Sequence, residues 1–344
     1  MSQPNPHERI QVDTSDDDFD AQSLTGSNLS FASSVRDYCY ENGRRYHAYR
    51  PGAYPIPNDE EEQDRLALAH HLFKLITGGD LYRAPLLRNG DSPLRVLDIG
   101  TGTGQWALEM AEDFPNAQIF GTDLSPIQPT WAPPNCRFFI DDAESDWAFA
   151  PSEAFDYIHC RSLAGGISDW PRLLRQAYKH LKPGGWFEAQ EFNAWVTSDD
   201  DTHKKAPLTM GWLERLNQAS IQFEKPLNVA PSLEQWFHEA GYANVADDMR
   251  CLWLTDWDQC PVGGWAKNRR LKELGRIGKA ALLEVVEPYT LALFTRVLGD
   301  SFPEAQEYMN KVRAELMGGS FHLYVLFHYV YGQKPMSEDP TVAP

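Results

Sequence analysis

One stretch decides the fold of this 344-residue chain: Arg95-Val96-Leu97-Asp98-Ile99-Gly100-Thr101-Gly102-Thr103-Gly104-Gln105-Trp106. Its first residues form the short apolar run that is typical of a β-strand covered on both faces. Three evenly spaced glycines follow, and at such positions a side chain would hold a ligand away from the backbone. The helix expected after them points its free N–H groups at whatever lies over the turn. The stretch therefore predicts a buried strand, a ligand-binding turn and a helix.

The glycine turn by itself leaves the ligand open between a dinucleotide and S-adenosylmethionine. Dinucleotide folds use the spacing G-x-G-x-x-G and hold a pyrophosphate at the helix N-terminus. Here the third glycine, Gly104, comes one residue earlier, and Asp98 precedes the turn. A carboxylate at that place would repel a pyrophosphate, whereas it suits a ligand that carries an ammonium and a sulfonium. A turn without any ligand is the remaining alternative, because a lone motif also occurs by chance.

The composition argues against several functions. Asp and Glu outnumber Lys and Arg by 49 to 31, which gives a formal net charge of −18, so direct binding to nucleic acid phosphates is not expected. The five cysteines are scattered and form no C-x-x-C, so neither a metal site nor a disulfide framework is predicted. No apolar run is long enough to span a bilayer, and the polar N-terminus lacks a signal-peptide core. We therefore expect a protein of the cytoplasm or the nucleus that does not bind membranes.

Beyond the glycine turn, short apolar runs alternate with helical patterns. Further strands are predicted over residues 117–122, 136–140, 155–161 and 186–192. Such alternation implies a parallel sheet with right-handed crossovers. Two more strands, 245–254 and 321–331, bracket a helical stretch that is interrupted near Pro288. The predicted fold class is α/β: a Rossmann-like, seven-stranded, mostly parallel sheet with helices on both faces, an N-terminal helical lid and a C-terminal helical insertion.

Composition and periodicity divide the chain into six segments. The first is acidic and too polar to offset chain entropy by burial, so we expect it to be disordered. The segments are a disordered acidic tail (1–30), an N-terminal helical lid (31–85), the ligand-binding core (86–260), a helical cap insertion (261–318), the final strand of the core (319–331) and a C-terminal tail (332–344).

Aromatic and arginine side chains crowd together between Ser34 and Tyr54. Two interpretations of this segment stay open: a helix packed on the domain with its arginines in water, or a lid that closes over a bound ligand. A second helix follows, with Asn58 as its N-cap, acidic residues in its first turn and Gly78 at its end.

Acidic residues follow the second and third predicted strands. Asp123 comes about 20 residues after the glycine turn, where an acid of nucleotide-binding folds accepts hydrogen bonds from ribose hydroxyls. Asp142 and Ala143 follow the next strand. That carboxylate could accept the exocyclic amine of an adenine, and the backbone N–H of Ala143 could meet a ring nitrogen. Since ligands of open α/β sheets bind at the carboxyl ends of the strands, we expect these residues to meet the glycine turn there.

Several motifs carry a family resemblance. Besides Val-Leu-Asp-Ile-Gly-Thr-Gly-Thr-Gly at residues 96–104, they are Asn42-Gly43-Arg44-Arg45-Tyr46-His47-Ala48-Tyr49-Arg50, Pro57-Asn58-Asp59-Glu60 with Glu61-Glu62-Gln63-Asp64-Arg65, Gly121-Thr122-Asp123-Leu124-Ser125-Pro126-Ile127-Gln128-Pro129, and Leu181-Lys182-Pro183-Gly184-Gly185. The order of these signals resembles that of Rossmann-like S-adenosylmethionine-dependent methyltransferases. From about residue 36 to about residue 260 the chain is similar to the fungal LaeA-like methyltransferases.

This resemblance implies S-adenosylmethionine as the cofactor and a role for individual residues toward it. The implied residues are Asp98 with Gly100, Thr101, Gly102 and Gly104 of the turn for the amino-acid end, Asp123 for the ribose, Leu124 against the adenine, Asp142 and Ala143 for the adenine edge, the carbonyl of Cys160 for the amine, its neighbour Arg161, and Tyr46 and Arg50 for the carboxylate.

Methyl transfer needs a general base only when the acceptor is a hydroxyl or a protonated amine. His159 and Glu191 are the predicted catalytic residues, because they lie near the carboxyl ends of predicted strands, where open α/β sheets bind ligands. Four other residues have a suitable side chain but a less favourable place: His47, Glu188, His322 and His328.

Two function classes follow from the resemblance. The first is an enzyme that methylates oxygen, nitrogen or sulfur of a small secondary metabolite, and the tryptophans of the helical segments suit a flat, apolar or aromatic acceptor. The second is a LaeA-like regulator of secondary metabolism that acts through protein partners in the nucleus. A nicotinamide-dependent dehydrogenase is disfavoured by the glycine spacing. Whether the chain pairs with a protein partner or with a second copy stays open.

Overall fold

The stretch that decides the fold forms the predicted strand, turn and helix. The computed structural model describes residues 38–86, 95–248 and 259–336, so the predicted tail 1–30 lies outside the described residues. β3 (Arg95–Ile99) has four of its five residues buried, and α3 (Gln105–Asp113) follows the glycine turn. β3 pairs in parallel with β4 (Gln118–Asp123) on one side and β6 (Phe155–Arg161) on the other. Its apolar run is thus explained by a central place in the sheet.

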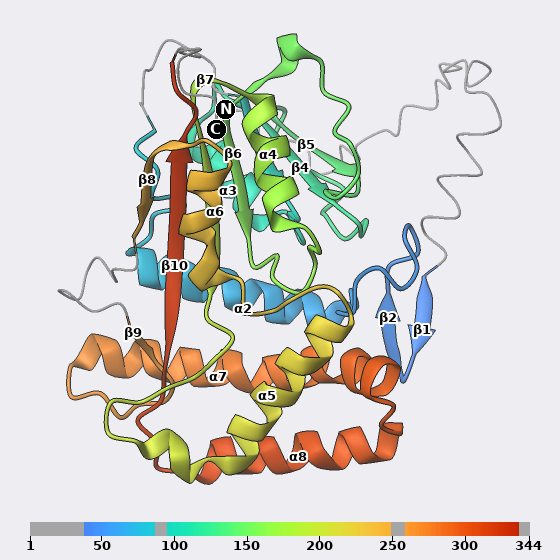
Figure 1. Cartoon of the computed structure of the whole chain (residues 1–344), viewed down its shortest axis with the longest axis vertical. Helices are drawn as coiled ribbons and strands as arrows, with labels where there is room; N and C mark the ends of the chain where they lie inside the picture. The colour runs from blue at the N-terminus through green and yellow to red at the C-terminus, as the bar shows by residue number, and fades with distance from the viewer. Residues whose placement is uncertain (1–37, 87–94, 249–258, 337–344) are drawn as a thin grey trace, which may run out of the picture.

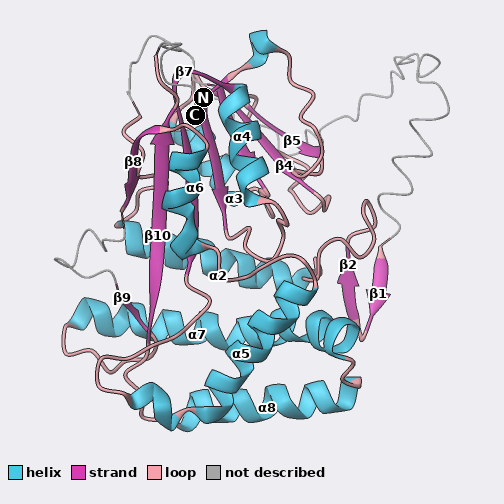
Figure 2. Cartoon of the chain, in the orientation of Figure 1, coloured by secondary structure: helices cyan, strands magenta, loops and turns pink. Residues whose placement is uncertain are grey.

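Seven strands form one sheet in the order β5-β4-β3-β6-β7-β10-β8 (Figures 1 and 2). Parallel pairing joins β5 (Cys136–Ile140), β4, β3, β6 and β7 (Leu181–Phe192). β10 (Tyr324–Gln333) is antiparallel to both β7 and β8 (Ala243–Asp247), and the short β9 (Gln259–Pro261) pairs with its first residues. The predicted mostly parallel sheet is confirmed, but with β9 it has eight strands in the described parts of the chain rather than the predicted seven.

Helices cover both faces of this sheet. On one face, α4 (Trp170–His180) and α6 (Leu233–Glu239) contribute to a core with residues of the strands. On the other face, α3 packs against β3, β4 and β6 through Trp106 and Met110. Burial of a large apolar side chain contributes about 1.5–3 kcal/mol, so each face gains from the fully buried Trp106 or Trp170. Asp169 caps α4 as predicted by accepting the N–H of Arg172 at 2.8 Å.

A layer of helices lies beyond the carboxyl ends of the parallel strands (Figure 1). α2 (Glu60–Thr77) runs along this edge, and α5 (Pro207–Gln222), α7 (Arg269–Ala292) and α8 (Phe302–Gly318) lie beneath it. Three short 3-10 helices complete the described helices: Pro151–Glu153, Thr202–Lys205 and Ala230–Ser232. The expected interruption near Pro288 was wrong, because α7 continues through Pro288 and changes only at Leu293–Leu298, into a π-helix.

One interpretation of residues 34–54 was a helix, and the described part of this segment does not form one. Its described part contains an antiparallel hairpin, β1 (Cys39–Glu41) and β2 (Arg44–Tyr46). Asn42 and Gly43 form the two-residue turn with φ of 52° and 80°, the conformation that Asn-Gly favours in hairpins. The predicted N-cap of α2 was wrong by one residue, because Asp59 rather than Asn58 accepts the N–H of Glu62.

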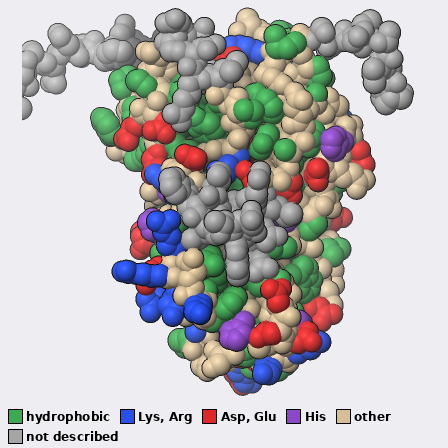
Figure 3. Space-filling model, turned by 90° about the vertical axis from the view of Figure 1, so that its left-hand side faces the viewer, with side chains coloured by type: hydrophobic (Ala, Val, Ile, Leu, Met, Phe, Trp, Pro, Cys, Tyr) green, Lys and Arg blue, Asp and Glu red, His purple; other side chains and the backbone are tan. Residues whose placement is uncertain are grey.

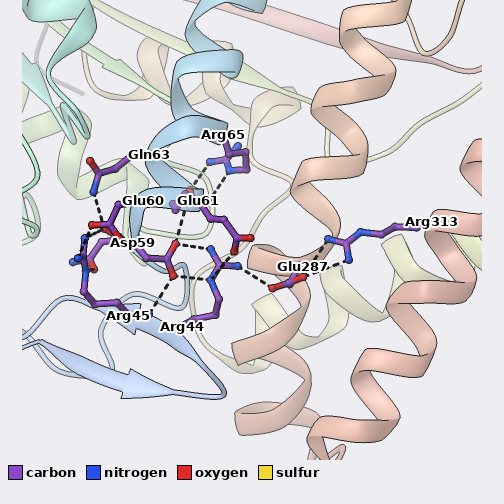
Figure 4. Close-up of polar contacts among 11 residues, drawn as sticks. Arg44, Arg45, Asp59, Glu60, Glu61, Gln63, Arg65, Glu287 and Arg313 are labelled. Atoms are coloured by element: carbon purple, nitrogen blue, oxygen red, sulfur yellow. Dashed lines mark hydrogen bonds and ion pairs between the residues drawn. The ribbon is translucent and has the colours of Figure 1, made fainter.

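A network of ion pairs between side chains connects this hairpin to the start of α2 and to α7 (Figure 4). Arg44 donates to Asp59 from Nε at 2.6 Å and from Nη2 at 2.7 Å, and its Nη1 lies 3.2 Å from Glu287 of α7. Glu287 also accepts from Arg313 of α8. The hairpin, the start of α2 and the helical layer are therefore held together by one buried arginine.

The remaining differences concern the ends of predicted elements. β8 covers only the first part of the predicted strand 245–254, whose end lies outside the described residues. β10 starts at Tyr324 and continues to Gln333, so residues 332 and 333 belong to the strand rather than to the predicted tail. α5, which was assigned to the core segment, packs with α8 and the π-helix Leu293–Leu298 in one hydrophobic cluster of the helical layer.

The surface charge is uneven although the chain is acidic. Lys and Arg side chains gather on part of the face shown in Figure 3, the side on which α7 begins. The residues Lys267, Arg269 and Arg270 at the start of α7 are exposed. Within the described ranges, no helix is both long and apolar enough to cross a membrane, and no cluster of three or more potential metal ligands occurs.

Candidate functional site

Three adjoining cavities lie where the carboxyl ends of the strands meet the helical layer. The central cavity borders the glycine turn, α2, α7 and β10. The strand-end cavity extends from the turn past the ends of β4 and β5, and the side chamber extends below β7 toward α5. Ser162 and Tyr289 line all three, so the cavities adjoin one another.

The glycine turn presents bare backbone to this space. Gly100 and Gly104 have φ of 64° and 80°, in the region that disfavours other residues. A Cβ on Gly100 would lie 2.2 Å from Leu163, and one on Gly104 would lie 2.6 Å from Phe138. Gly100, Thr101 and Gly102 line the central cavity, as the sequence predicts for a turn that holds a ligand.

Asp123 ends β4 and lines the strand-end cavity beside Leu124. Its two carboxylate oxygens accept the N–H of Gly102 and the N–H of Ser125, each at 2.8 Å. A carboxylate has about four acceptor sites, so capacity for ligand hydroxyls remains. Burial raises the pKa of Asp123 to about 6.

Asp142 and Ala143 line the far part of the same cavity. One oxygen of Asp142 accepts the N–H of Glu144 at 2.9 Å, which fixes the carboxylate. The other lies 3.4 Å from Nε of Arg50. Arg50 therefore reaches this end of the site, whereas the sequence assigned it to the opposite end of the cofactor.

Asp98 is buried between two partners at the floor of the central cavity. Its Oδ2 accepts the hydroxyl of Thr101 at 2.6 Å, and its Oδ1 lies 2.7 Å from Nδ1 of His159. Because an ionised carboxylate only accepts, Nδ1 of His159 carries the proton. The imidazole stacks on Trp106 with ring centroids 3.8 Å apart, and its buried Nε2 has no hydrogen-bond partner.

Arg161 lies at the wall that the central and strand-end cavities share. Its Nη2 donates to Nδ1 of His70 at 2.9 Å, and Nε2 of His70 in turn lies 3.0 Å from Glu109. Burial lowers the pKa of Arg161. Among the described residues no carboxylate lies within ion-pair distance of Arg161, which suits the guanidinium to an anionic ligand group.

His70 is a residue of the site that the sequence reasoning missed. It lines the central cavity from α2, and burial lowers its pKa. Arginine only donates, so His70 accepts at Nδ1 and is held in the neutral tautomer protonated at Nε2. Its position on the helix face that carries Leu66, Ala69 and Phe73 was the available signal.

Glu191 lines the side chamber rather than the central cavity. Its Oε1 accepts the N–H of Leu163 at 2.6 Å and that of Ala164 at 3.3 Å, while the buried Oε2 has no partner. Burial raises the pKa of Glu191 to about 8. At neutral pH this side chain is therefore mainly a carboxylic acid.

Four predicted cofactor residues do not line any of the three cavities: Gly104, Arg50, Tyr46 and Cys160. Tyr46 is buried under the guanidinium of Arg296, 4.6 Å from its ring centroid. The side chain of Cys160 is fully buried in the sheet core. Burial also raises the pKa of its thiol.

The four less favoured candidates for a base are structural residues outside the three cavities. Glu188 accepts the N–H groups of Arg83 and Ala84 and so holds a loop against the sheet. The three histidines are each bound by one or two protein groups: His47 by the carbonyl of Arg50, His322 by Asp200, and His328 by Asp247 and Asn193.

Residues 68–247 match the family described as Methyltransferase domain, which is more than half of the chain. The chain belongs to this methyltransferase family. It is 43% identical to "Methyltransferase pytC" of Aspergillus terreus over 96% of this chain and 97% of that protein. It is 34% identical to "Secondary metabolism regulator laeA" of Aspergillus flavus over 89% of this chain and 80% of that protein. The resemblance to LaeA-like methyltransferases is thereby confirmed.

A solved structure also matches this methyltransferase. It is phosphoethanolamine N-methyltransferase 2 of Haemonchus contortus in complex with S-adenosyl-L-methionine, at 18% identity over 79% of this chain and 52% of that chain, with a TM-score of 0.41.

The residues of the site are compatible with S-adenosylmethionine, the cofactor that the sequence predicts. Gly100 and Gly102 border both the central and the strand-end cavities, and Asp123 stands at the end of β4. Arg161 has no carboxylate partner among the described residues and so adds a place for an anionic group.

Proposed function

We propose that this enzyme methylates oxygen, nitrogen or sulfur of a small, apolar or aromatic secondary metabolite in a fungal natural-product pathway. One observation carries the proposal: the central cavity at the glycine turn adjoins a side chamber with apolar walls from α5, α7 and β10. The similarity to "Methyltransferase pytC" over nearly the whole chain supports it.

The proposed cofactor contacts follow the cavities. Asp142 and the N–H of Ala143 read the adenine, Leu124 packs against it, and Asp123 accepts from the ribose hydroxyls. The amino-acid end lies along the glycine turn near Asp98, and the carbonyl of Cys160 accepts from its ammonium. When bound, S-adenosylmethionine supplies a methyl group on an electrophilic sulfonium.

For the cofactor carboxylate we propose Arg161 in place of Tyr46 and Arg50. Arg161 lies where the central and strand-end cavities meet, and its charge has no carboxylate partner in the described parts of the chain. His70 orients the guanidinium through the hydrogen bond to Nδ1. Tyr46 lies instead under Arg296, and Arg50 faces Asp142.

His159 has the arrangement of a general base. Asp98 holds the proton on Nδ1, which leaves the lone pair of Nε2 for a proton taken from the central cavity. An acceptor with a hydroxyl or a protonated amine would need this base. Glu191, the other predicted catalytic residue, lines the side chamber rather than the central cavity.

A second candidate function is regulation of secondary metabolism through protein partners in the nucleus, as a LaeA-like protein. The 34% identity to a secondary metabolism regulator over 89% of this chain favours it. In that case the acceptor would be a protein, and the place in the cell would be the nucleus rather than the cytoplasm.

Incubation of the purified protein with S-adenosylmethionine and a fungal metabolite extract, read by mass spectrometry, separates the two functions. We expect at least one small molecule to gain a single methyl group. Methylation of proteins alone, with no modified small molecule, would overturn the first proposal and support the second. A reaction without enzyme and one with S-adenosylhomocysteine in excess are the controls.

A further inference from the structure

The side chamber has one unusual group in an apolar wall. Trp212 and Leu216 from α5 face Val285 from α7 and Val325 from β10. The indole N–H of Trp212 is already bound by the hydroxyl of Thr290 at 2.7 Å, so the ring contributes only apolar surface to the chamber. Asn193 and Asn217 reach the chamber as well.

Glu191 brings a carboxyl group into these surroundings from β7. Its Oε1 is held by two backbone N–H groups, whereas its Oε2 is fully buried and unpaired. Buried polar atoms of proteins are nearly always paired, so an orphan at a cavity wall indicates a missing ligand group. Since Oε1 accepts from the backbone, a proton on this carboxyl group resides on Oε2.

The chemistry of that missing group follows from the state of the acid. Burial favours the neutral form of Glu191. A neutral acid with its proton on Oε2 has one hydrogen bond to donate, and the side chamber is the cavity that Glu191 lines. The natural partner is an oxygen that accepts, such as a ketone, ester or ether oxygen on an otherwise apolar molecule. A carboxylate would have to be desolvated in a chamber with no cationic lining residue, and an ammonium would find only Glu191 itself, which burial favours in the neutral form.

We propose that Glu191 is a specificity residue that binds an uncharged, carbonyl-bearing acceptor by donating a hydrogen bond from Oε2, and that it is not the general base. The acceptor's apolar body fills the side chamber, while its reacting atom points into the central cavity. This inference rests on the proposed small-molecule methyltransferase activity and narrows its substrate class. It leaves His159 as the residue that handles protons.

Two substitutions at this position separate a donor from a base. In Glu191→Gln the amide oxygen still accepts from Leu163 and the amide nitrogen still donates into the chamber. In Glu191→Leu both functions are lost at similar volume. Glu188→Gln is the matched control, because Glu188 is the other buried glutamate of β7 but lines none of the cavities.

The probes are acetophenone, ethylbenzene and benzoate, which share one ring and differ in the group offered to Oε2. We measure their binding by calorimetry to the full chain. We expect wild type, Glu191→Gln and Glu188→Gln to bind acetophenone about tenfold more tightly than ethylbenzene, which is the usual gain from one hydrogen bond of about 1.4 kcal/mol. Glu191→Leu should bind both alike, and benzoate should bind wild type more weakly than acetophenone.

Loss of the acetophenone preference in Glu191→Gln would overturn the inference, as would equal binding of all probes or no binding to wild type. Titration of every variant with S-adenosylmethionine shows that the fold is intact and tests the proposed function on its own. Wild type that binds the probes selectively but not S-adenosylmethionine would reject the methyltransferase proposal and leave the chamber assignment standing. Once an acceptor is known, a drop of 10²-fold or more in kcat for Glu191→Gln would identify a base instead.

Discussion

Replacement of Arg44 by methionine tests whether the N-terminal hairpin is held to the cofactor site by charge. Arg44 is 7% exposed and makes two short hydrogen bonds to Asp59 and a third to Glu287. Removing one partner of a buried ion pair costs about 3–5 kcal/mol. The loss should be smaller here, about 2–3 kcal/mol, because Asp59 keeps two backbone N–H groups and Glu287 keeps Arg313.

The assay is equilibrium unfolding in urea combined with thermal melts. A loss of that size lowers Tm by about 3–5 °C for a chain of this length, because the entropy of unfolding is about 2.1 cal/mol/K per residue. A double-mutant cycle with Asp59→Asn, which keeps an N-cap oxygen, should give a coupling energy of about 2 kcal/mol. A coupling below about 0.5 kcal/mol would refute the reasoning. Arg45→Met is the control, since its ion-pair partner Glu60 is exposed and its loss should be clearly smaller.

The same variant changes the response to acid. Burial raises the pKa of Asp59, but hydrogen bonds from Arg44 and backbone N–H groups outweigh it, so its pKa is lowered overall. A lowered folded pKa means that Asp59 contributes fully above its unfolded pKa of about 3.9 and that the contribution is lost as pH falls through the folded value. As pH falls below about 4, the free energy of unfolding should therefore decrease more steeply for wild type than for Arg44→Met.

Four further outcomes are expected. Asp123→Asn should weaken S-adenosylmethionine binding about 10- to 100-fold by calorimetry. The wild-type affinity should fall as pH drops through about 6, because the pKa of Asp123 is raised and the protonated acid accepts hydrogen bonds less well. An affinity that does not change from pH 5 to 8 would contradict this. Arg161→Met should raise the Kd for S-adenosylmethionine by at least tenfold, with Arg161→Lys in between; equal Kd values would speak against a carboxylate contact. Gly104→Ala should lower the free energy of unfolding by about 1–3 kcal/mol in urea, since its Cβ would meet Phe138, and an unchanged midpoint would disprove the clash. His159→Asn keeps a hydrogen-bond donor for Asp98 but lacks Nε2. The rate of methylation of a hydroxyl acceptor should therefore fall 10²- to 10⁴-fold, with little change in cofactor affinity. Unchanged turnover would exclude His159 as the base.

The sequence predicted those parts of the fold and site that depend on local chemistry. The glycine turn, Asp123 and Asp142 follow their strands directly, so spacing alone places them at one edge of the sheet. The hairpin at residues 39–46 was also signalled locally, by Asn42-Gly43, but the density of aromatic and arginine residues suggested a helix instead.

Long-range contacts account for what the sequence could not predict. Arg50 lies beside Asp142, and Arg44 reaches Glu287, 243 residues away. His70 joins the site only because α2 crosses the strand ends, where it meets Arg161 of β6. The side chamber exists because α5, α7 and β10 converge, and no single stretch encodes that convergence.

The walls of the central cavity have a consequence for synthesis of the chain. Trp106 and Phe327, which lie far apart in the sequence, both line it. At about 5–20 residues per second a ribosome needs roughly 10–45 s to add the intervening residues. During that time the glycine turn is present but its enclosing wall has not been made. The proposed cofactor contacts, all between residues 98 and 161, are therefore synthesised well before β10, and a nascent chain that stalls before β10 should leave the central cavity open to solvent.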